Sequence, residues 1–431
     1  MRFRSLALVF ATLAGCTVSV PLEGKRCAAT EPRCLPGYQC VNDFCVTDAG
    51  NEAPQDAGCA FDVDPLASAC MGSDWYLAQS GDDARDGRSA ANARRTLAPA
   101  MINGGDRIHL LGRWTTGPAL SNLSGSASCP LIISGDADAG TVIANTIDVG
   151  GSYVVWTKLV FTPQPMQDSI HLAGNARFLT FHDDTFTGPS VPTGSYPYFI
   201  DFASGSRCDD CTVRNSSFDA SEHRLADIDG TNFSFVANRV VLREGPNLQL
   251  HDDGARVEGN DFSGAFNDFA LQLDGTGVVA FNVFHNVSVT FPDKRMLTAP
   301  RARVTRNTFT QISTDNDIEL VQAQRFDDNL ISNANNVVAG APPPAGDWNI
   351  FAPDVARPYV ASDGGVFGTD RRASVDFEAG FTPLGSNLAI DGADPSLPVP
   401  PGGGLLADVG AVERGATRTS RGSYCAADGG L

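Results

Sequence analysis

The middle of the chain repeats a short arrangement of apolar positions around an asparagine. An apolar residue, two further residues, Asn, one residue and a second apolar residue recur five times, with 22, 22, 25 and 22 residues between successive asparagines. A repeat of this length predicts stacked coils of a solenoid. The five copies are Phe235/Asn238/Val240, Val257/Asn260/Phe262, Val279/Asn282/Phe284, Val304/Asn307/Phe309 and Phe326/Asn329/Ile331, and two degenerate copies precede them at Phe181/Asp184/Phe186 and Val213/Ser216/Phe218.

A second apolar alternation precedes each asparagine by about one strand. Alternation with a period of two indicates strands that are buried on one side. One coil cannot bury its inward side chains, whereas coils stacked ~4.8 Å apart pair every strand with its neighbours. Asn tolerates the left-handed backbone conformation, so we expect it at the sharp bend between strands, aligned along one edge. The alternating pairs are Ile170/Leu172, Ile200/Phe202, Leu248/Leu250, Leu271/Leu273 and Ile318/Leu320, with Ile228 alone in one coil.

These features resemble the pectate-lyase-like superfamily of right-handed parallel β-helices over about residues 75–340. A leucine-rich repeat has a similar period, but it needs Leu-rich strands and helical segments, and Phe and Val dominate here. We therefore predict an all-β, right-handed parallel β-helix over 59–340. The resemblance implies an N-terminal cap, in which we expect a short helix over Arg95–Ile102. It implies nothing about activity.

The repeat breaks after residue 340 at Ala341-Pro342-Pro343-Pro344. Residues 341–415 resemble the C-terminal segment of bacterial surface β-helix proteins, which implies that they cover the last coil. An unstructured tail is the alternative, although the Phe, Ile and Val content favours packing. Residues 416–431 are expected to form a loose tail.

The N-terminus has the features of an export signal. Arg2 and Arg4 precede a short apolar run over 6–13, which ends in Leu13-Ala14-Gly15-Cys16. The run is too short to span a bilayer. Residues 1–16 resemble a bacterial lipoprotein signal, which implies lipidation of Cys16 and a lipid anchor in the outer membrane, facing the periplasm or the cell surface. An ordinary secretory signal is the alternative.

Cysteine usage agrees with export. Removing Cys16 from the 11 cysteines leaves ten, an even number that indicates disulfides in an oxidising compartment. Residues 17–46 form a predicted Cys-rich module, and 47–58 a flexible linker. The module's spacing lacks His, which favours disulfides over zinc. For Cys208-Asp-Asp-Cys211 a local disulfide is favoured over redox chemistry. The disulfide candidates are Cys27, Cys34, Cys40, Cys45, Cys59, Cys70, Cys208 and Cys211, with Cys59–Cys70 as a local pair and Cys129 and Cys425 left over.

The net charge of −19 argues against binding to nucleic acid, which requires a basic face. We expect a monomer that contacts the membrane through its lipid alone. The remaining partner class is a polysaccharide or a cell-surface glycan.

Outward side chains of the strand before each Asn predict two rows. One runs through His171, Asp201, Asp227, Gln249, Gln272 and, past one unclear coil, Glu319; the other contains Asp229, His251 and Asp274. Neighbours in a row would lie ~4.8 Å apart, so Asp229 and Asp274 would have a separation compatible with an inverting glycosidase. A calcium site and a solvated polar face are the alternatives.

Lys294 and Arg295 lie in the longest loop between coils and form a second catalytic candidate. Some polysaccharide lyases of this fold use Lys or Arg as the proton-abstracting base, although no lyase motif can be transferred here residue by residue. The sequence thus predicts a cell-surface lipoprotein that binds glycans through its β-helix face. The alternative is a polysaccharide lyase or glycoside hydrolase acting on acidic polysaccharide. No cofactor is required, and calcium stays open.

Overall fold

The computed structural model describes most of the central chain. It divides into two compact units, Met1–Pro54 and Gln55–Leu431. The described residues are 38–41, 44–47, 70, 72–98, 101–136, 140–189, 197–202, 205–221, 223–243, 248–266, 269–289, 295–314, 319–334, 336–339, 346–347, 349–355, 357–359, 370–373, 416–418 and 424–426.

The described part of the first unit is an antiparallel hairpin. Its strands are β1 (Tyr38–Val41) and β2 (Phe44–Thr47), and Cys40 lies opposite Cys45 in the register. Most of the predicted Cys-rich module, the lipoprotein signal with Cys16 and the linker lie outside the described residues. No helix in the described residues is long and apolar enough to cross a membrane.

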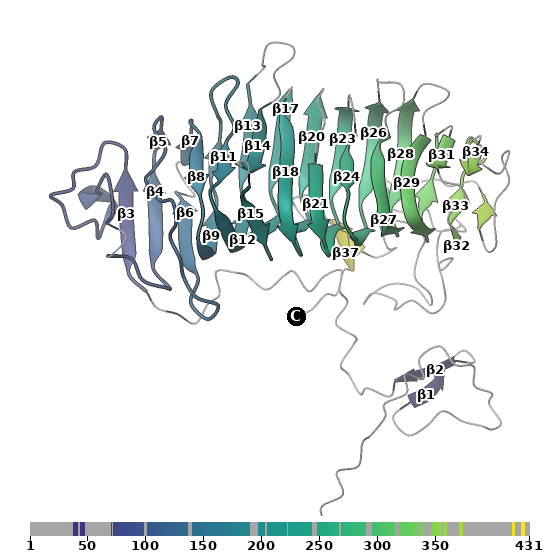
Figure 1. Ribbon diagram of the computed structural model, residues 1–431, viewed down its shortest axis with the longest axis horizontal. Helices are drawn as coiled ribbons and strands as arrows, with labels where there is room; N and C mark the ends of the chain where they lie inside the picture. Colours follow the sequence, from purple (N-terminus) through teal and green to yellow (C-terminus); the bar gives the residue numbers. More distant parts are fainter. Residues whose placement is uncertain are drawn as a thin grey trace, which may run out of the picture. The chain divides into compact units, whose positions relative to one another are not determined.

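The second unit is the predicted parallel β-helix, in which successive coils stack side by side (Figure 1). Each coil contributes strands to three faces, here named A, B and C in chain order. Face C is a separate sheet of twelve strands. Its strands in stacking order are β5 (Arg113–Trp114), β7 (Val142–Ile143), β10 (Val160–Phe161), β13 (Thr185–Gly188), β17 (Ser217–Ser221), β20 (Arg239–Arg243), β23 (Asp261–Phe266), β26 (Val283–Val289), β28 (Thr308–Thr314), β30 (Leu330–Ile331), β33 (Ile350–Phe351) and β35 (Arg371–Arg372).

Faces A and B join into one sheet of 21 strands, because several strands continue around the corner between them. Face A contains β8 (Ile147–Val149), β11 (Ile170–Leu172), β14 (Tyr198–Phe202), β18 (Arg224–Thr231), β21 (Leu248–Asp253), β24 (Leu271–Leu273), the first parts of β27 (Leu297–Thr305) and β29 (Glu319–Asp327), β31 (Asn336–Ala339) and β34 (Arg357–Tyr359). Face B contains β3 (Asp74–Ala78), β4 (Arg107–Leu111), β6 (Leu131–Gly135), β9 (Ser152–Thr157), β12 (Asn175–His182), β16 (Thr212–Arg214), β19 (Ser234–Val236), β22 (Ala255–Glu258), β25 (Gly277–Ala280), the last parts of β27 and β29, and β32 (Gly346–Asp347), with β15 (Arg207–Asp209) at the corner.

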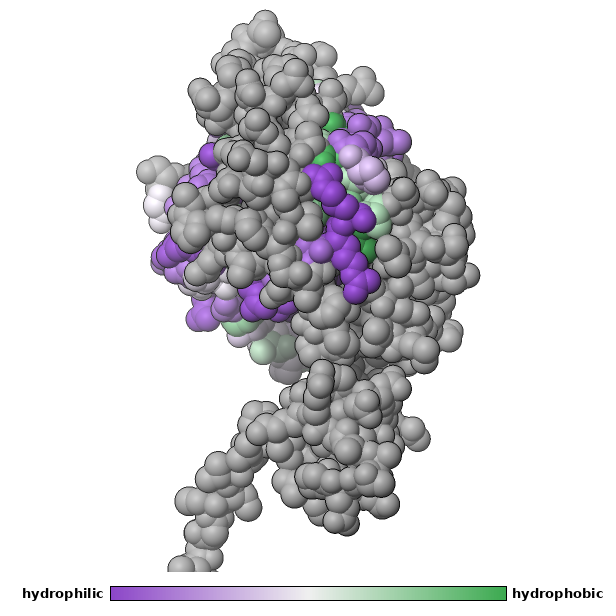
Figure 2. All heavy atoms as spheres, turned by 90° about the vertical axis from the view of Figure 1, so that its right-hand side faces the viewer, coloured by the Kyte–Doolittle hydropathy of each residue, from purple (hydrophilic) through white to green (hydrophobic). Residues whose placement is uncertain are grey.

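Apolar columns run through the interior, as the repeat predicts. On face C, consecutive phenylalanines stack with centroids 4.5–5.0 Å apart, for example Phe186 on Phe218 and Phe262 on Phe284. Ring pairs of this kind add to the free energy gained by burying their area. Outside this core, the described surface is mainly hydrophilic in the view along the long axis (Figure 2).

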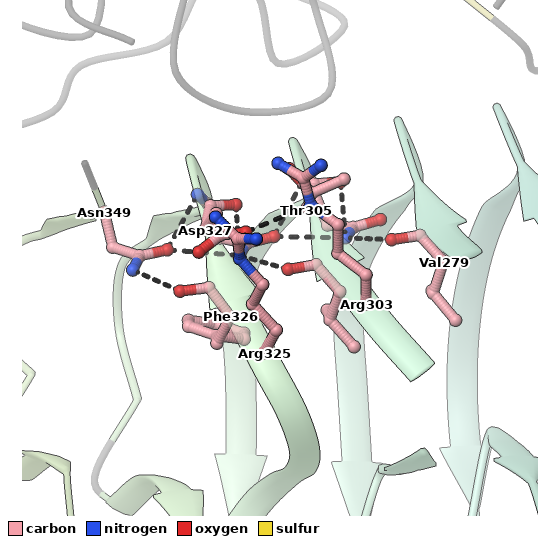
Figure 3. Close-up of polar contacts among 10 residues, drawn as sticks. Val279, Arg303, Thr305, Arg325, Phe326, Asp327 and Asn349 are labelled. Atoms are coloured by element: carbon pink, nitrogen blue, oxygen red, sulfur yellow. Dashed lines mark hydrogen bonds and ion pairs between the residues drawn. The ribbon is translucent and has the colours of Figure 1, made fainter. Parts of the chain in front are cut away.

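The five predicted asparagines lie along one edge, between faces B and C, and form a buried hydrogen-bonded ladder. From Asn260 onward, each Oδ1 accepts hydrogen bonds from the backbone N and the Nδ2 of the preceding asparagine, as Asn282 does from Asn260 at 3.0 and 2.9 Å. Asn349 extends the ladder, and its own Nδ2 donates to the carbonyl of Phe326 (Figure 3). Asp370 closes the ladder by accepting from Asn349 at 2.8 Å.

The left-handed backbone at this edge belongs to the residue before each Asn, and not to the Asn itself as the sequence analysis assumed. Ala237, Phe281 and Arg306 have φ of 57°, 56° and 52°, while the following asparagines are fully buried. Burial lets the amide satisfy main-chain groups of two coils, so the strain of the bend falls on its neighbour. The asparagine therefore joins coils and does not itself form the turn.

Both ends of the β-helix differ from expectation. The described residues 95–98 and 101–102 contain no α-helix, because Pro99 disfavours helical conformation at the residue before it; a 3-10 turn, η2 (Ala90–Asn92), lies nearby. At the other end, parallel pairing continues past residue 340 through β33 and β35. The predicted capping segment beyond residue 373 and most of the tail lie outside the described residues, apart from a hairpin of β36 (Ala416–Arg418) and β37 (Tyr424–Ala426).

Two disulfides are present among the described cysteines. Cys208–Cys211 confirms the predicted local bridge. Cys70 pairs with Cys129, so the expected Cys59–Cys70 pair is wrong. Because Cys129 lies just before β6, the second bridge ties the start of the β-helix to a later coil, which sequence separation gave no reason to expect.

Candidate active site on face A

The outward side chains of face A form the predicted first row. Register pairs join Asp148 to His171, His171 to Asp201, Asp227 to Gln249 and Gln249 to Gln272. The row continues through Thr298 to Gln322, so the expected place of Glu319 in it is wrong. Gln272 precedes its ladder asparagine by ten residues, whereas Gln322 precedes Asn329 by only seven, because β29 turns from face A to face B with fewer residues. We define the first row as Asp148, His171, Asp201, Asp227, Gln249, Gln272, Thr298 and Gln322.

Short strands with buried neighbours hold this row outward. Gln249 and Gln272, for example, each lie between two fully buried leucines. The turn after β24 is tight, since a Cβ on Gly275 would lie 1.5 Å from the carbonyl oxygen of Asp252. Glycine at this position lets adjacent coils approach directly beside the row.

The second row, Asp229, His251 and Asp274, also lies on face A as predicted. Asp229 and His251 are register partners, and His251 Nδ1 lies 2.8 Å from Asp274 Oδ2. The other imidazole nitrogen, Nε2, lies 2.8 Å from the Gln249 amide nitrogen and 3.6 Å from Asp227 Oδ1. His251 thus bridges carboxylates of Asp274 and Asp227, rather than of Asp274 and Asp229.

Asp274 is held from a second side. The Gln272 amide donates to both of its carboxylate oxygens, at 2.8 and 3.1 Å. With His251 Nδ1 as a further donor, the carboxylate has a fixed orientation beside the rows. This arrangement suits a base that activates water.

Asp227 has a different environment. Burial raises the pKa of its carboxyl, while the His251 charge and a hydrogen bond from the Tyr198 hydroxyl at 3.4 Å oppose that rise. Tyr198 in turn accepts a hydrogen bond from Arg224, and burial raises the pKa of its hydroxyl. A carboxyl that keeps its proton to higher pH is suited to a general acid. Asp227 and Asp274 therefore differ in environment: the first is held partly by burial, the second by amide and imidazole contacts.

Three ligand-type side chains gather further along the first row. Oxygen or nitrogen atoms of Asp168, His171 and Asp201 all lie within 4.8 Å of one another. His171 Nε2 lies 2.9 Å from Asp168, whose other oxygen accepts the Tyr198 backbone N–H. An imidazole nitrogen is a poor ligand for Ca²⁺, which prefers oxygen. The donor set therefore does not fit the calcium left open by the sequence, and no chemical step is assigned to a metal.

Of the two basic candidates, only Arg295 belongs to the described residues. Lys294 lies outside the described residues. Arg295 is half-buried and lies two residues before Leu297, the register partner of Leu271. Asp274 follows the opposite end of β24. At ~3.3 Å per residue, Arg295 and Asp274 are separated by roughly 16 Å along the strand direction.

Sequence reasoning missed Tyr198, Asp168 and Arg224. The coils of Tyr198 and Arg224 begin face A with two consecutive buried residues, Phe199–Ile200 and Leu225–Ala226. This pair interrupts the alternation of inward and outward residues. Counted in steps of two from the strand, Tyr198 and Arg224 would therefore be expected to point inward, although they face the row. Asp168 lies before its strand, where no periodicity applies.

A scan of protein-family models finds no match to this chain, and a search of curated proteins finds none. Solved structures of similar fold exist. The pectate lyase Pel9A is 16% identical, with a TM-score of 0.47, over 80% of this chain and 97% of that one. The similarity is one of fold. A mannuronic acid-specific family 6 polysaccharide lyase from human gut microbiota is 11% identical, with a TM-score of 0.38, over 65% of this chain and 74% of that chain. A lacto-N-biosidase of family GH136 from Eubacterium ramulus is 10% identical, with a TM-score of 0.31, over 70% of this chain and 68% of that chain.

Proposed function

We propose that this protein is an exported, lipid-anchored carbohydrate-active protein whose face A binds a glycan chain. The observation that carries the proposal is the first row, in which eight successive coils each present a polar side chain at the same register position. Carboxylate, imidazole and amide groups at a regular spacing are suited to the hydroxyls of a repeating sugar polymer. A lipid on Cys16 would keep the protein at the outer membrane.

Charge favours a neutral glycan. Within the first and second rows, all of whose members belong to the described residues, every ionisable side chain is Asp or His. The carboxylates of an acidic polysaccharide would meet these aspartates at close range, and like charges repel. We therefore place neutral glycans ahead of the uronate polymers that a lyase would require.

Hydrolysis of the bound glycan is the second part of the proposal. Asp227 acts as the general acid and Asp274 as the base that activates water. Asp274 lies two coils from Asp227 and two residues further along the strand, so their backbones are separated by roughly 12 Å. Their carboxyl groups are closer, because both contact the one imidazole of His251, and this spacing is in the range of inverting glycosidases. His251 contacts both carboxylates and fixes their spacing.

A panel of neutral and acidic glycans, scored for binding by calorimetry and for cleavage by new reducing ends, tests both parts. We expect Asp227→Asn and Asp274→Asn to lower cleavage on the order of 10²–10⁴-fold while binding persists. Asp219→Asn, an exposed carboxylate on face C, is the matched control and should cleave normally. Binding without cleavage by the unaltered protein would remove the hydrolase assignment, and failure to bind any glycan would remove the whole proposal.

A further inference from the structure

A third polar row, separate from the two rows of face A, lies on face B in the first coils of the β-helix. Tyr76, His109, Ser134 and Thr157 are register partners in four successive coils. They line a hollow of about 350 Å³, together with Arg107, Asp136 and Lys158 and an apolar part formed by Ala90, Leu111 and Ile132. The glycan-binding rows on face A make no use of this hollow.

His109 connects a carboxylate to a hydroxyl. Its Nε2 lies 3.0 Å from Asp74 Oδ1, and its Nδ1 lies 3.3 Å from Ser134 Oγ. A carboxylate can only accept, so the proton resides on Nε2 and Nδ1 carries the lone pair. Nδ1 therefore accepts the hydrogen bond of the Ser134 hydroxyl. Nucleophilic hydrolases use this order of Asp, His and Ser, and it is recognised by geometry rather than by sequence position.

The imidazole is held in place. Its ring stacks on Tyr76 with centroids 4.6 Å apart and an interplanar angle of 16°. With Asp74 on one nitrogen and the aromatic ring on one face, His109 has little freedom to turn away from Ser134. A general base must be kept within hydrogen-bond reach of the proton that it removes.

Two groups beside Ser134 can stabilise negative charge. Thr157, its register partner in the next coil, has 0% exposure and a hydroxyl without a hydrogen-bond partner among the described residues. An unsatisfied buried hydroxyl is destabilising, and a ligand in the hollow would relieve it. Lys158 follows Thr157 with φ of 57°, and in the described part of the chain its ammonium forms no ion pair.

Gly135 keeps this corner close to Ser134. A Cβ on Gly135 would lie 2.1 Å from the carbonyl oxygen of Lys158. Only glycine therefore allows the Lys158 corner to pack directly against the residue that follows Ser134. The backbone of Lys158 therefore lies beside Ser134 and Thr157, and all three residues line the hollow.

We propose that this hollow hydrolyses short-chain acyl esters, with Ser134 as the nucleophile. Ser134 Oγ attacks the ester carbonyl carbon while its proton passes to His109 Nδ1, and the oxyanion forms beside Thr157 and Lys158. The ester C–O bond then breaks, and His109 returns the proton to the departing alcohol. Water repeats the sequence on the acyl-serine, releasing the carboxylic acid and restoring Ser134. Asp74 is a positioning residue that holds the His109 tautomer.

The test uses the secreted, lipid-free chain with p-nitrophenyl acetate as substrate and a fluorophosphonate as an active-site probe. We expect hydrolysis above the buffer rate, a single labelled peptide containing Ser134, and a loss on the order of 10³-fold or more in Ser134→Ala. Asp74→Asn should lower kcat with little change in KM, and Asp74→Glu should restore part of it. A purely structural role of Asp74 would not give this pattern.

Ser234→Ala is the matched control, because Ser234 is also an outward serine of face B but has Thr212 and Arg256 as register partners instead of a histidine. It should hydrolyse the ester and take up the probe at the unaltered rate. Equal hydrolysis by Ser134→Ala and the unaltered protein, or labelling at another residue, would overturn the assignment. Circular dichroism confirms that the variants are folded. Asp227→Asn should not affect ester hydrolysis, which separates this site from the glycan hydrolase on face A.

Discussion

At the bend between faces B and C, one residue adopts an unfavourable backbone conformation and the next forms favourable buried hydrogen bonds. Five successive coils, from Asn238 to Asn329, place a residue with positive φ immediately before the ladder asparagine, and four of these five residues are not glycine. Left-handed backbone is unfavourable by about 1–2 kcal/mol for a residue with a Cβ. The strain is tolerated because the buried ladder residue that follows gains several hydrogen bonds.

Ala237→Gly should stabilise the protein. Ala237 has φ of 57°, and the equivalent residue in the next coil is already Gly259 with φ of 64°. Relief of strain exceeds the added flexibility of the unfolded chain, so we expect a gain of up to about 1 kcal/mol in the free energy of unfolding. Urea denaturation measures it. Ala226→Gly, in the interior of β18, should instead lose stability, and a loss in both variants would contradict the strain.

Asp252 should make stability depend on pH. Burial raises the pKa of its carboxyl to about 6, against a backbone hydrogen bond from Phe233 that lowers it. The folded state therefore binds a proton more readily than the unfolded state, and stability falls as pH rises from about 4 through 6. This shift corresponds to roughly 3 kcal/mol at most. Thermal unfolding from pH 4 to 7 should show a smaller decline in Asp252→Asn than in the unaltered protein; equal declines would exclude the effect.

At the scale of elements, the sequence predicted the stacking of the coils better than it predicted which side chains meet on their outer faces. Apolar columns and ladder positions repeat in every coil, so several copies could be compared, and Asn238 to Asn329 aligned as expected. Where one copy differed, prediction failed: the shorter corner within β29 displaced Glu319 from the first row. Tyr198 and Arg224 were missed because paired buried residues at the start of face A reverse the alternation.

The sequence placed three catalytic candidates in one row, Asp229, His251 and Asp274; Asp229 is the register partner of His251, and His251 contacts Asp274. The link from His251 to Asp227 crosses between rows and depends on side-chain length, which periodicity does not describe. The hydrogen bonds among Asp74, His109 and Ser134 join residues of the first three coils, in which the asparagine repeat is absent. No spacing rule in the sequence could identify it.

Asn282→Ala tests the ladder as an element. Its side chain accepts from Asn260 twice and donates to Val257 and Asn307, all in full burial. The substitution leaves several buried groups unsatisfied, each worth about 1–3 kcal/mol, so we expect a loss of roughly 3 kcal/mol or more. Chemical denaturation gives the value. Asn175→Ala, on an exposed position of β12, should change little; comparable losses would show that the ladder has no special role.

At the scale of the whole molecule, stability depends on contacts between adjacent coils. The Cys70–Cys129 disulfide joins positions 59 residues apart at the first coils. Replacing both cysteines with serine should lower the stability of those coils by about 3–4 kcal/mol, because a loop of this length is no longer closed in the unfolded chain. Hydrogen exchange should then show faster exchange in β3 and β4 than in β23 and β26. Uniform acceleration along the β-helix would indicate that the coils unfold as one unit.

The nearly constant 22-residue step also provides a natural increment of growth. A duplicate of residues 238–259 inserted after residue 259 would supply one further ladder asparagine, one apolar position in the face C column, equivalent to Val240, and one Gln–His pair on face A. Duplication or deletion of one such unit would therefore lengthen or shorten face A, the surface proposed to bind glycan, by one coil. The coils joined by the Cys70–Cys129 disulfide and the end of the ladder at Asp370 would stay unchanged.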